Sequence, residues 1–325
     1  MNGELRLAVL DSTNASAPAN IPGGSVGSRA ALKPRHRSLD VGGIEVFYRE
    51  VAAVAEPCVL LLHGFPSSSH TFRDVLAPLG EVSRVVAPDL PGFGFSAAPG
   101  VDDYECTFAH LADTVEAFLE RIGVEKFFVY LHDFGAPVGY HLATRHPERI
   151  LGLIVQNGNA HHDGLGSQWD TAKDFWADPS DANRARLPEW LNFEGTRYQY
   201  LGDLPERVRE LHPPESWHLD WARMMRPGNV EAQFRLFRDY ANHVARFDEL
   251  AEYHRTYQPP CLLLWGRHDA FYELDEIMAY ARELDRLDMH VYDGGHLVLE
   301  THAGECATAM REFVAEIAAE RSRPR

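Results

Sequence analysis

The sequence predicts an α/β fold, in which helices flank a mostly parallel central sheet and a helical cap is inserted into the chain. Continuous apolar strands alternate with helices, as at residues 58–64 and 126–131, and this pattern is typical of a parallel sheet covered on both faces. The alternation stops over residues 159–256, which contain no strand pattern. A helical insertion between two parallel strands is expected to cover the carboxyl edge of the sheet, where open α/β sheets bind ligands.

The first part of the core is expected at residues 34–158, after a flexible N-terminal tail over residues 1–33. The tail is predicted because residues 11–30 are rich in Ser, Ala, Gly, Pro and Asn and have no apolar period. Apolar runs predict the strands of this part, and the helical spacing of apolar residues predicts its helices. In order, we expect strands at residues 44–51, 58–64, 84–90, 126–131 and 150–156, and helices at residues 69–79, 107–122 and 135–145.

The predicted cap, residues 159–256, consists of polar helical segments with many aromatic side chains, such as Trp169 and Trp190. The α/β pattern resumes in the second part of the core, residues 257–325, where the same criteria apply. There we expect strands at residues 261–266 and 289–293, and helices at residues 274–284 and 305–320.

The chain has 325 residues, with 31 Lys and Arg side chains against 48 Asp and Glu side chains, and a formal charge of −17. This acid excess repels phosphate backbones and anionic lipids, so neither nucleic acid nor a membrane is an expected partner. The sequence shows no apolar run long enough to span a bilayer, no secretory signal and no C-x-x-C pair. We therefore expect a cytoplasmic protein, as a monomer or a homodimer.

Asp133 is the first candidate catalytic residue, because it lies between a predicted strand and a predicted helix in YLHDFGAPVG. Gly135 and Ala136 follow it, and small residues there let the strand and the helix approach closely and hold a nucleophile at the sheet edge. Leu131 stands where the strict G-x-nucleophile-x-G motif has glycine. The alternative is that Asp133 only caps the helix that follows it.

Two further candidates follow later strands at the same predicted edge. Asp269 lies just after a strand in WGRHDAF, and His296 follows the last strand in DGGHLVLE. One helix and one strand separate them, so the fold can bring the two side chains together, as an acid that orients a histidine base. An earlier segment, LLLHGFPSSSH, places His63 and Phe65 after another strand.

Over nearly its whole length after the tail, the chain resembles the α/β-hydrolase superfamily. The segments HGFPSSSH, PDLPGFGFS, HDFGAP, WGRHD and GGHLVLE carry the resemblance, and the order nucleophile, acid, histidine is that of the superfamily's triad. The aspartate in HDFGAP resembles that of the branch with an aspartate nucleophile, which includes epoxide hydrolases, haloalkane dehalogenases and fluoroacetate dehalogenases. The resemblance implies an α/β-hydrolase fold with Asp133, Asp269 and His296 as catalytic residues.

The resemblance also implies that the backbone N–H groups of Phe65 and Phe134 form an oxyanion hole. His63 is expected beside the substrate, in a structural hydrogen-bonding role. Attack by Asp133 on a saturated carbon gives an ester that His296 and water can hydrolyse, whereas a serine would give an ether. The expected substrate therefore has an electrophilic saturated carbon, as in an epoxide or a carbon–halogen bond.

An epoxide needs a proton donor for its leaving oxygen, and epoxide hydrolases resemble one another in using cap tyrosines for this. Tyr240, in FRDYANHVARF, resembles the later of two such tyrosines. Phe175 stands near the position of the earlier one, so help from Trp176, Tyr198 or Tyr200 is expected at the substrate. The alternative is that Tyr240 belongs to the packed core of the cap.

This sequence differs from those of the dehalogenases at the residue after the expected nucleophile. Haloalkane dehalogenases resemble one another in having tryptophan there, and fluoroacetate dehalogenases in having arginine, whereas this chain has Phe134. Phe65 replaces the asparagine of one major dehalogenase group. We therefore favour hydrolysis of a small lipophilic epoxide to a diol, with hydrolysis of a carbon–halogen bond as the alternative.

Three other functions are less favoured. An ester or lactone hydrolase would make Asp133 form an anhydride with an acyl carbon. A ligand-binding protein without turnover is opposed by the complete predicted triad. A metal enzyme is opposed by the spacing of His161, His162 and Asp163, which does not match a helical metal motif. No metal and no cofactor are expected, and water is the second substrate.

Overall fold

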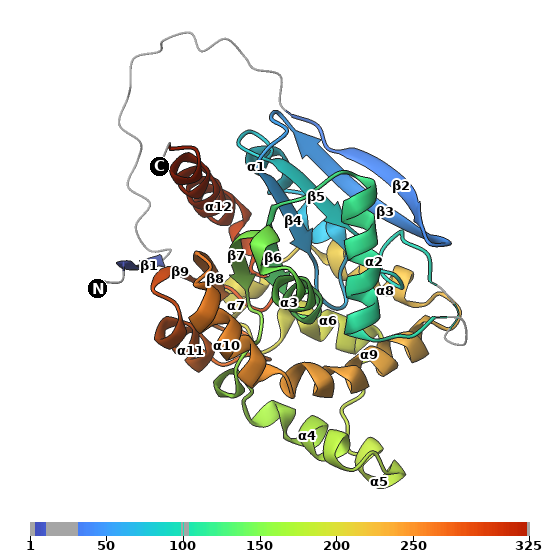
Figure 1. Cartoon of the computed structure of the whole chain (residues 1–325). Coiled ribbons are helices and arrows are strands. Elements are labelled where there is room, and N and C mark those ends of the chain that lie inside the picture. Colours follow the sequence, from blue (N-terminus) through green and yellow to red (C-terminus); the bar gives the residue numbers. More distant parts are fainter. Residues whose placement is uncertain (1–3, 11–31, 99, 101–103, 324–325) are drawn as a thin grey trace.

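The computed structural model of the chain describes residues 4–10, 32–98, 100 and 104–323. Its centre is a nine-stranded sheet with the order β1-β9-β8-β7-β6-β4-β5-β3-β2 (Figure 1). Strand β3 pairs antiparallel with β2 and β5, and the other neighbouring strands are parallel. The mostly parallel sheet of the sequence prediction is thus confirmed. The strands are β1 (Glu4–Leu10), β2 (Arg35–Val41), β3 (Ile44–Ala52), β4 (Cys58–Leu62), β5 (Arg84–Pro88), β6 (Phe127–His132), β7 (Ile150–Gln156), β8 (Cys261–Gly266) and β9 (Arg286–Tyr292).

Two hydrophobic cores lie on the two faces of the sheet, because successive side chains of a strand point to opposite faces. In β4, Leu60 and Leu62 belong to one core, whereas Val59 and Leu61 belong to the other. Helices on both faces cover the sheet, as the continuous apolar strands predicted. The first core contains α2 (Phe108–Arg121), α3 (Gly135–Arg145), α10 (Phe247–Tyr257) and α11 (Asp275–Glu283), and the second contains α1 (Leu76–Leu79) and α12 (Leu299–Arg321).

The chain between β7 and β8 is helical. Residues 157–260 are all described, and none of them forms a strand. Figure 1 shows α4, α5 and α9 at the end of the molecule opposite α1 and α12. Besides α10, the helices of this insertion are α4 (Asp170–Ala177), α5 (Asp181–Arg184), α6 (Phe193–Leu201), α7 (Glu206–Arg209), α8 (Pro214–Met224) and α9 (Asn229–Val244).

Part of the predicted N-terminal tail belongs to the sheet. Strand β1 pairs in parallel with β9, from Glu4 opposite Arg286 to Leu10 opposite Tyr292. Without it, β9 would present a row of unpaired N–H and C=O groups, which a further strand satisfies. The prediction of a flexible tail is therefore corrected for residues 4–10. The remainder of the tail up to residue 31 lies outside the described residues.

Two other elements differ from the sequence prediction. The helix expected at residues 69–79 is divided into a 3₁₀ turn, Ser69–Phe72, and the short α1. Pro78 has no N–H to donate, which disfavours one continuous helix through this segment. Strand β2 was not predicted, and it forms a hairpin with β3 through Gly42 and Gly43, whose φ angles of 63° and 90° suit a two-residue turn.

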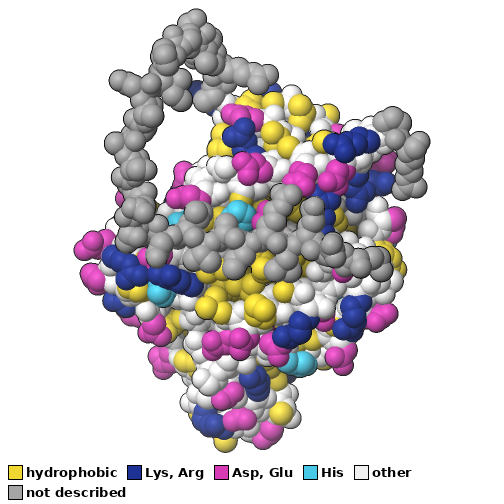
Figure 2. Space-filling model, turned by 90° about the vertical axis from the view of Figure 1, so that its left-hand side faces the viewer, with side chains coloured by type: hydrophobic (Ala, Val, Ile, Leu, Met, Phe, Trp, Pro, Cys, Tyr) yellow, Lys and Arg dark blue, Asp and Glu magenta, His cyan; other side chains and the backbone are white. Residues whose placement is uncertain are grey.

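The excess of acidic side chains is spread over the surface. Figure 2 shows Asp and Glu side chains interspersed with Lys and Arg across one face of the molecule. Some of them form ion pairs, such as those of Arg286 with Glu316 and Glu320. Within the described ranges, we find no helix with both the length and the apolar character that a bilayer span requires.

Candidate active site

Asp133 lies at the sharp turn between β6 and α3. Its φ angle is 47°, in the left-handed region that a residue other than glycine adopts only where the surrounding structure enforces it. Neighbouring backbones approach this turn closely. A Cβ atom on Gly135 would lie 2.5 Å from the Leu62 carbonyl oxygen, and one on Gly64 would lie 2.4 Å from the Asp133 Cβ. Glycine at both positions therefore allows the turn that holds the Asp133 side chain at the sheet edge.

The loop after β4 holds one oxygen of the Asp133 carboxylate. The Phe65 backbone N–H donates to Oδ1 at 2.6 Å. The Phe134 backbone N–H also acts on this carboxylate and lowers its pKa. The two N–H groups expected to form an oxyanion hole are thus gathered at the carboxylate, while Oδ2 faces His296, whose Nε2 lies 3.7 Å away.

His296 is oriented by Asp269, which other groups fix in turn. The Nδ1 atom of His296 lies 3.0 Å from Asp269 Oδ2. Asn157 donates its side-chain N–H to the same oxygen at 2.7 Å, and the Phe271 backbone N–H donates to Oδ1 at 2.7 Å. The structure therefore brings the three predicted triad residues together, with Nε2 of His296 directed at Asp133. This arrangement allows a histidine to act as a base.

Burial and charge act on both groups of this pair. Burial raises the pKa of the Asp133 carboxyl above its ordinary value, although the charge of His296 and the N–H groups of Phe65 and Phe134 oppose the rise. Burial lowers the pKa of His296, but the charge and hydrogen bond of Asp269, with the charge of Asp133, outweigh it and raise the pKa. The protonation of His296 thus depends on the charge of Asp133.

Tyr272 is a residue of the site that the sequence reasoning missed. Its hydroxyl donates to Oδ2 of Asp133 at 3.2 Å. The Tyr240 hydroxyl lies 3.0 Å from the Tyr272 hydroxyl. Burial raises the pKa of both hydroxyls well above the ordinary value, so both remain protonated at neutral pH. The insertion and the core thus each contribute one tyrosine to a hydrogen-bonded pair beside Asp133.

A cavity of about 540 Å³ reaches Asp133 from the insertion. Its wall is mostly aromatic and aliphatic, and its polar residues include Glu189 and Glu194. Among the described residues that line it, none is Lys or Arg. The cavity is large enough for a small organic molecule. Its aromatic residues are Phe65, Phe134, Trp169, Trp190, Tyr198, Phe237 and Phe271.

Of the aromatic residues Phe175, Trp176, Tyr198 and Tyr200, which the sequence analysis considered at the substrate beside Tyr240, only one lines this cavity. It is Tyr198, although its hydroxyl donates to Asp203 on the surface. Phe175 and Trp176 instead line a second cavity of about 270 Å³. The Trp176 indole N–H donates to the Phe237 carbonyl oxygen at 3.2 Å, which directs it into the packed interior of the insertion.

Tyr200 and His63 are held away from the cavity wall. Tyr200 is buried, and its hydroxyl donates to the Asp220 carboxylate. His63 is fully buried, and its Nε2 accepts a hydrogen bond from the Leu90 backbone N–H at 3.0 Å. Its Nδ1 lies 3.0 Å from the Gly64 carbonyl oxygen. The backbone thus occupies both ring nitrogens of His63, which places it in a supporting position for the loop after β4.

Residues 57–303 match the model of the family described as the alpha/beta hydrolase fold. The chain belongs to this family. Over 279 residues it is 36% identical to an uncharacterised hydrolase of Saccharomyces cerevisiae, covering 84% of this chain and 94% of that protein. This α/β-hydrolase is also similar in structure to the protein Cfl2 of Burkholderia cenocepacia, with 23% identity, a TM-score of 0.69, and coverage of 86% of this chain and 96% of that one.

Two relatives with named activities are also similar to this α/β-hydrolase. Epoxide hydrolase 3 of Xenopus tropicalis is 26% identical over 321 residues, which cover 93% of this chain and 82% of that protein. A haloalkane dehalogenase of Bradyrhizobium diazoefficiens is 38% identical over 145 residues, but these cover only 42% of this chain and 46% of that protein. The chain is therefore a hydrolase of the α/β family with both epoxide hydrolases and haloalkane dehalogenases among its relatives.

The sequence does contain a signal for Tyr272. Asp269 accepts a hydrogen bond from the N–H group two residues later, and aspartate commonly forms such a turn. This turn directs Phe271 to the cavity and Tyr272 to Asp133. The aromatic pair Phe271 and Tyr272 is thus placed at the site by the aspartate turn that precedes it.

Substituting Gly64→Ala should destabilise this α/β-hydrolase by about 1–3 kcal/mol, because the new methyl group would overlap Asp133. Gly304→Ala is the matched control, since Gly304 lies in α12 with no atom within 4 Å of an added Cβ. That change should be neutral or stabilise the helix by up to about 1 kcal/mol. Urea unfolding measures both, and equal midpoints for Gly64→Ala and the parent protein would contradict the close approach.

Proposed function

We propose that this α/β-hydrolase hydrolyses small neutral epoxides to diols, with Asp133 as the nucleophile. The observation that carries the proposal is the pair Tyr240 and Tyr272, whose hydroxyls are hydrogen-bonded to each other and to Oδ2 of Asp133. A strained ring oxygen leaves as an alkoxide that stays attached to the product, so its departure requires a proton donor close to the nucleophile. Two protonated tyrosines supply that donor.

In the first step, Oδ2 of Asp133 attacks one epoxide carbon and the carbon–oxygen bond of the ring breaks. With the attacking atoms about 3 Å apart, the ring oxygen lies roughly 4.5 Å from Oδ2. The Tyr272 hydroxyl, 3.2 Å from Oδ2, can reach that oxygen and transfer its proton to it. The Tyr240 hydroxyl, 3.0 Å from that of Tyr272, stabilises the phenolate that forms. The product of this step is a hydroxyalkyl ester of Asp133.

In the second step, His296 removes a proton from water, which attacks the carbonyl carbon of the ester. Negative charge develops on the former Asp133 carbonyl oxygen, where the N–H groups of Phe65 and Phe134 stabilise it. The bond from that carbon to the alkyl oxygen then breaks, and the alkyl oxygen takes the proton from His296 and leaves in the diol. The carboxyl proton of the regenerated Asp133 returns to the Tyr272 phenolate, which restores the free enzyme. Ester formation removes the charge of Asp133, which together with Asp269 raises the pKa of His296. The pKa of His296 therefore falls at the stage when a base is required.

The cavity supports a neutral, lipophilic substrate. Its wall is largely aromatic, and none of its described lining residues is Lys or Arg. Glu189 and Glu194 would repel a carboxylate on the substrate. A haloacid is therefore a poor fit, whereas an aryl or alkyl epoxide fits the wall.

Hydrolysis of a neutral haloalkane is the second candidate. The similarity to a haloalkane dehalogenase favours it, although that similarity covers less than half of either chain. A halide requires weak N–H donors in an apolar pocket. The Trp169 indole N–H is not free for this, because it donates to the Phe271 carbonyl oxygen at 2.6 Å. The tyrosine pair, in contrast, supplies the proton that an epoxide oxygen needs, and it therefore favours the epoxide over the haloalkane.

We also propose that residues 159–256 of the insertion form a cap over the active site and that the protein works in the cytoplasm. Support for the cap comes from the cavity, which lies between Asp133 of the core and residues of α4 and α6. The location is supported by four cysteines that are buried and unpaired, as expected in a reducing compartment. These are Cys58, Cys106, Cys261 and Cys306.

A single turnover of an aryl epoxide in H₂¹⁸O should place the label in the Asp133 carboxylate and leave the diol unlabelled, whereas further turnovers should carry the label from Asp133 into the diol. The label enters because water attacks the ester carbonyl and not the substrate carbon. His296→Gln should accumulate the ester, seen as an added substrate mass on the Asp133 peptide. Asp133→Ala should abolish turnover, and epoxide hydrolysis that persists in this variant would overturn the mechanism. Halide release from a haloalkane, with no diol formed from the epoxide, would favour the second candidate.

Tyr272→Phe should lower kcat/KM for the epoxide by roughly 10²–10⁴, because the proton donor nearest the ring oxygen is lost. The same change should leave any haloalkane turnover within a few-fold, since a halide leaves without a proton. Tyr257→Phe is the control, because Tyr257 is exposed at the end of α10. Steady-state rates on both substrate classes measure the effect. An equal loss on both would mean that Tyr272 only packs beside Asp133.

The rate of ester hydrolysis should rise with pH, because His296 must be neutral to remove a proton from water. The midpoint of this rise should lie below the pKa of His296 in the free enzyme, where the charges of Asp269 and Asp133 raise that pKa. Single-turnover rates across pH give the first value, and an NMR titration of the His296 ring gives the second. A rate that falls with rising pH would exclude His296 as the base.

A further inference from the structure

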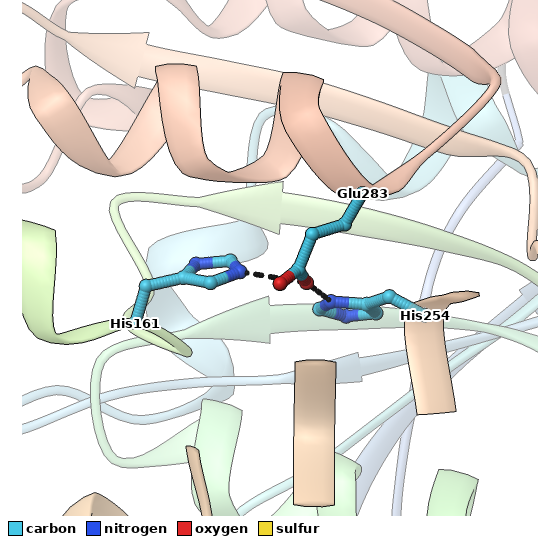
Figure 3. Close-up of side chains that lie close together, drawn as sticks. All are labelled: His161, His254 and Glu283. Carbon is cyan, nitrogen blue, oxygen red and sulfur yellow. Dashed lines mark hydrogen bonds and ion pairs between the residues drawn. The ribbon is translucent and has the colours of Figure 1, made fainter. Parts of the chain in front are cut away.

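A second group of side chains, outside the Asp133 cavity, has the composition of a metal site. His161 and His254 each direct one ring nitrogen at the Glu283 carboxylate, and the three candidate ligand atoms all lie within 4.8 Å of one another (Figure 3). Oε2 of Glu283 lies 3.0 Å from Nε2 of His161 and 2.9 Å from Nδ1 of His254. None of the three lines the cavity at Asp133.

The spacing of these atoms is close to that of a zinc site. Zinc binds histidine nitrogen and carboxylate oxygen at about 2.0–2.2 Å, so ligand atoms in a tetrahedral site are about 3.3 Å apart. The separations of 2.9 and 3.0 Å would need to widen by only a few tenths of an ångström. The two histidine nitrogens, which lie within 4.8 Å of each other, would have to take up the same spacing. The side chains of His161 and Glu283 are 9% and 11% exposed, whereas that of His254 is fully buried, so the group lies just below the surface.

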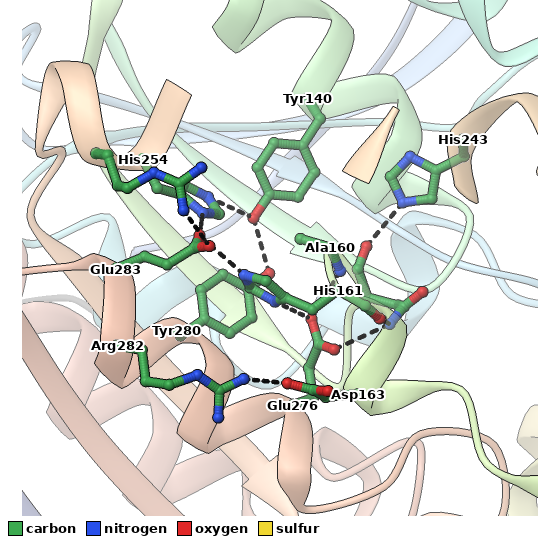
Figure 4. A network of polar contacts seen from close by, with 12 residues as sticks. Tyr140, Ala160, His161, Asp163, His243, His254, Glu276, Tyr280, Arg282 and Glu283 are labelled. Atoms are coloured by element: carbon green, nitrogen blue, oxygen red, sulfur yellow. Dashed lines mark hydrogen bonds and ion pairs between the residues drawn. The ribbon is translucent and has the colours of Figure 1, made fainter. Parts of the chain in front are cut away.

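The other ring nitrogen of each histidine already has the partner that a metal-bound histidine requires. Nδ1 of His161 lies 2.8 Å from Oε1 of Glu276, and Nε2 of His254 lies 3.1 Å from the Tyr140 hydroxyl (Figure 4). Glu276 is fully buried and is held by the Ala160 backbone N–H at 2.7 Å. A carboxylate behind a histidine fixes the ring and its tautomer, as in many zinc sites.

The charges around the group are also compatible with a divalent cation. Glu276 and Glu283 contribute two negative charges. The nearest basic side chain, Arg255, lies 3.4 Å from Oε1 of Glu283, and it is 55% exposed and therefore able to turn into solvent. Arg282 is paired with Asp163 and does not face the point between the three ligands.

We infer that His161, His254 and Glu283 form a binding site for one divalent transition-metal ion of the zinc class. His161 lies at the start of the insertion, His254 lies in α10 at its end, and Glu283 ends α11 of the core. A bound ion therefore connects both crossings of the chain between the sheet and the insertion. The ion has a structural role and takes no part in the reaction at Asp133.

Chelator-treated full-length protein should bind one equivalent of Zn²⁺ in a calorimetric titration, with an increase in Tm. Ca²⁺ should not bind there, because it prefers ligand sets of oxygen alone. Glu283→Gln should weaken Zn²⁺ binding by at least 100-fold and remove the increase in Tm. Glu276→Gln should weaken it by about 10–100-fold, because only the partner of a ligand is changed. His218→Gln, which changes an exposed histidine in α8, should bind as the parent protein does.

Equal affinity and stoichiometry in the parent and Glu283→Gln proteins would overturn the site and leave the three side chains as a hydrogen-bonded bridge. Absence of Zn²⁺ binding by the parent would overturn it equally. Because a variant can fail to fold, a further measurement, the Co²⁺ spectrum, uses the parent protein alone. One equivalent of Co²⁺ should give the intense visible absorption of a tetrahedral site with nitrogen and oxygen ligands. The weak spectrum of hydrated Co²⁺ would contradict the assignment.

Discussion

The close approach of backbones around Asp133 is the constraint on which the rest of the site depends. Neighbouring strands β4 and β6 end side by side, so the loop after β4 must pass against the turn after β6. Glycine at positions 64 and 135 makes the passage possible, and the turn holds Asp133 at a φ of 47°. The same contact brings the Phe65 N–H to within 2.6 Å of Oδ1. One packing requirement thus presents Asp133, the proposed nucleophile, and brings to it an N–H group of the proposed oxyanion hole.

The residues that the sequence located best are those at the ends of parallel strands. Asp133, Asp269 and His296 each lie within four residues of the end of such a strand, and parallel strands end at one edge, so local pattern was enough to bring them together. Positions within the insertion were harder to predict, because its helices have no strand register to fix them. Tyr200, for example, turns toward Asp220 inside the insertion. Strand β1 was missed because its partner β9 lies at the far end of the chain.

The loop after β7 connects the active site to the cluster around His161. Asn157 holds Asp269 of the triad, and two residues later Asn159 donates to Glu276 at 3.0 Å. No spacing motif could reveal this connection, since the partners come from the insertion and from both parts of the core. Residues that looked like a histidine-rich run in the sequence are separated by the fold. His161 turns inward to Glu276, whereas the neighbouring His162 is exposed.

The glutamates of the cavity also bear on product release. The diol product of the proposed reaction is neutral, so Glu189 and Glu194 present no electrostatic barrier to its release. It is also more strongly hydrated than the proposed epoxide substrate, so an aromatic wall holds it less tightly. Both glutamate side chains would instead repel a carboxylate product as it leaves the cavity. In the proposed reaction the cavity thus favours neutral molecules both when the substrate binds and when the product is released. Weak inhibition by the product is the expected kinetic consequence.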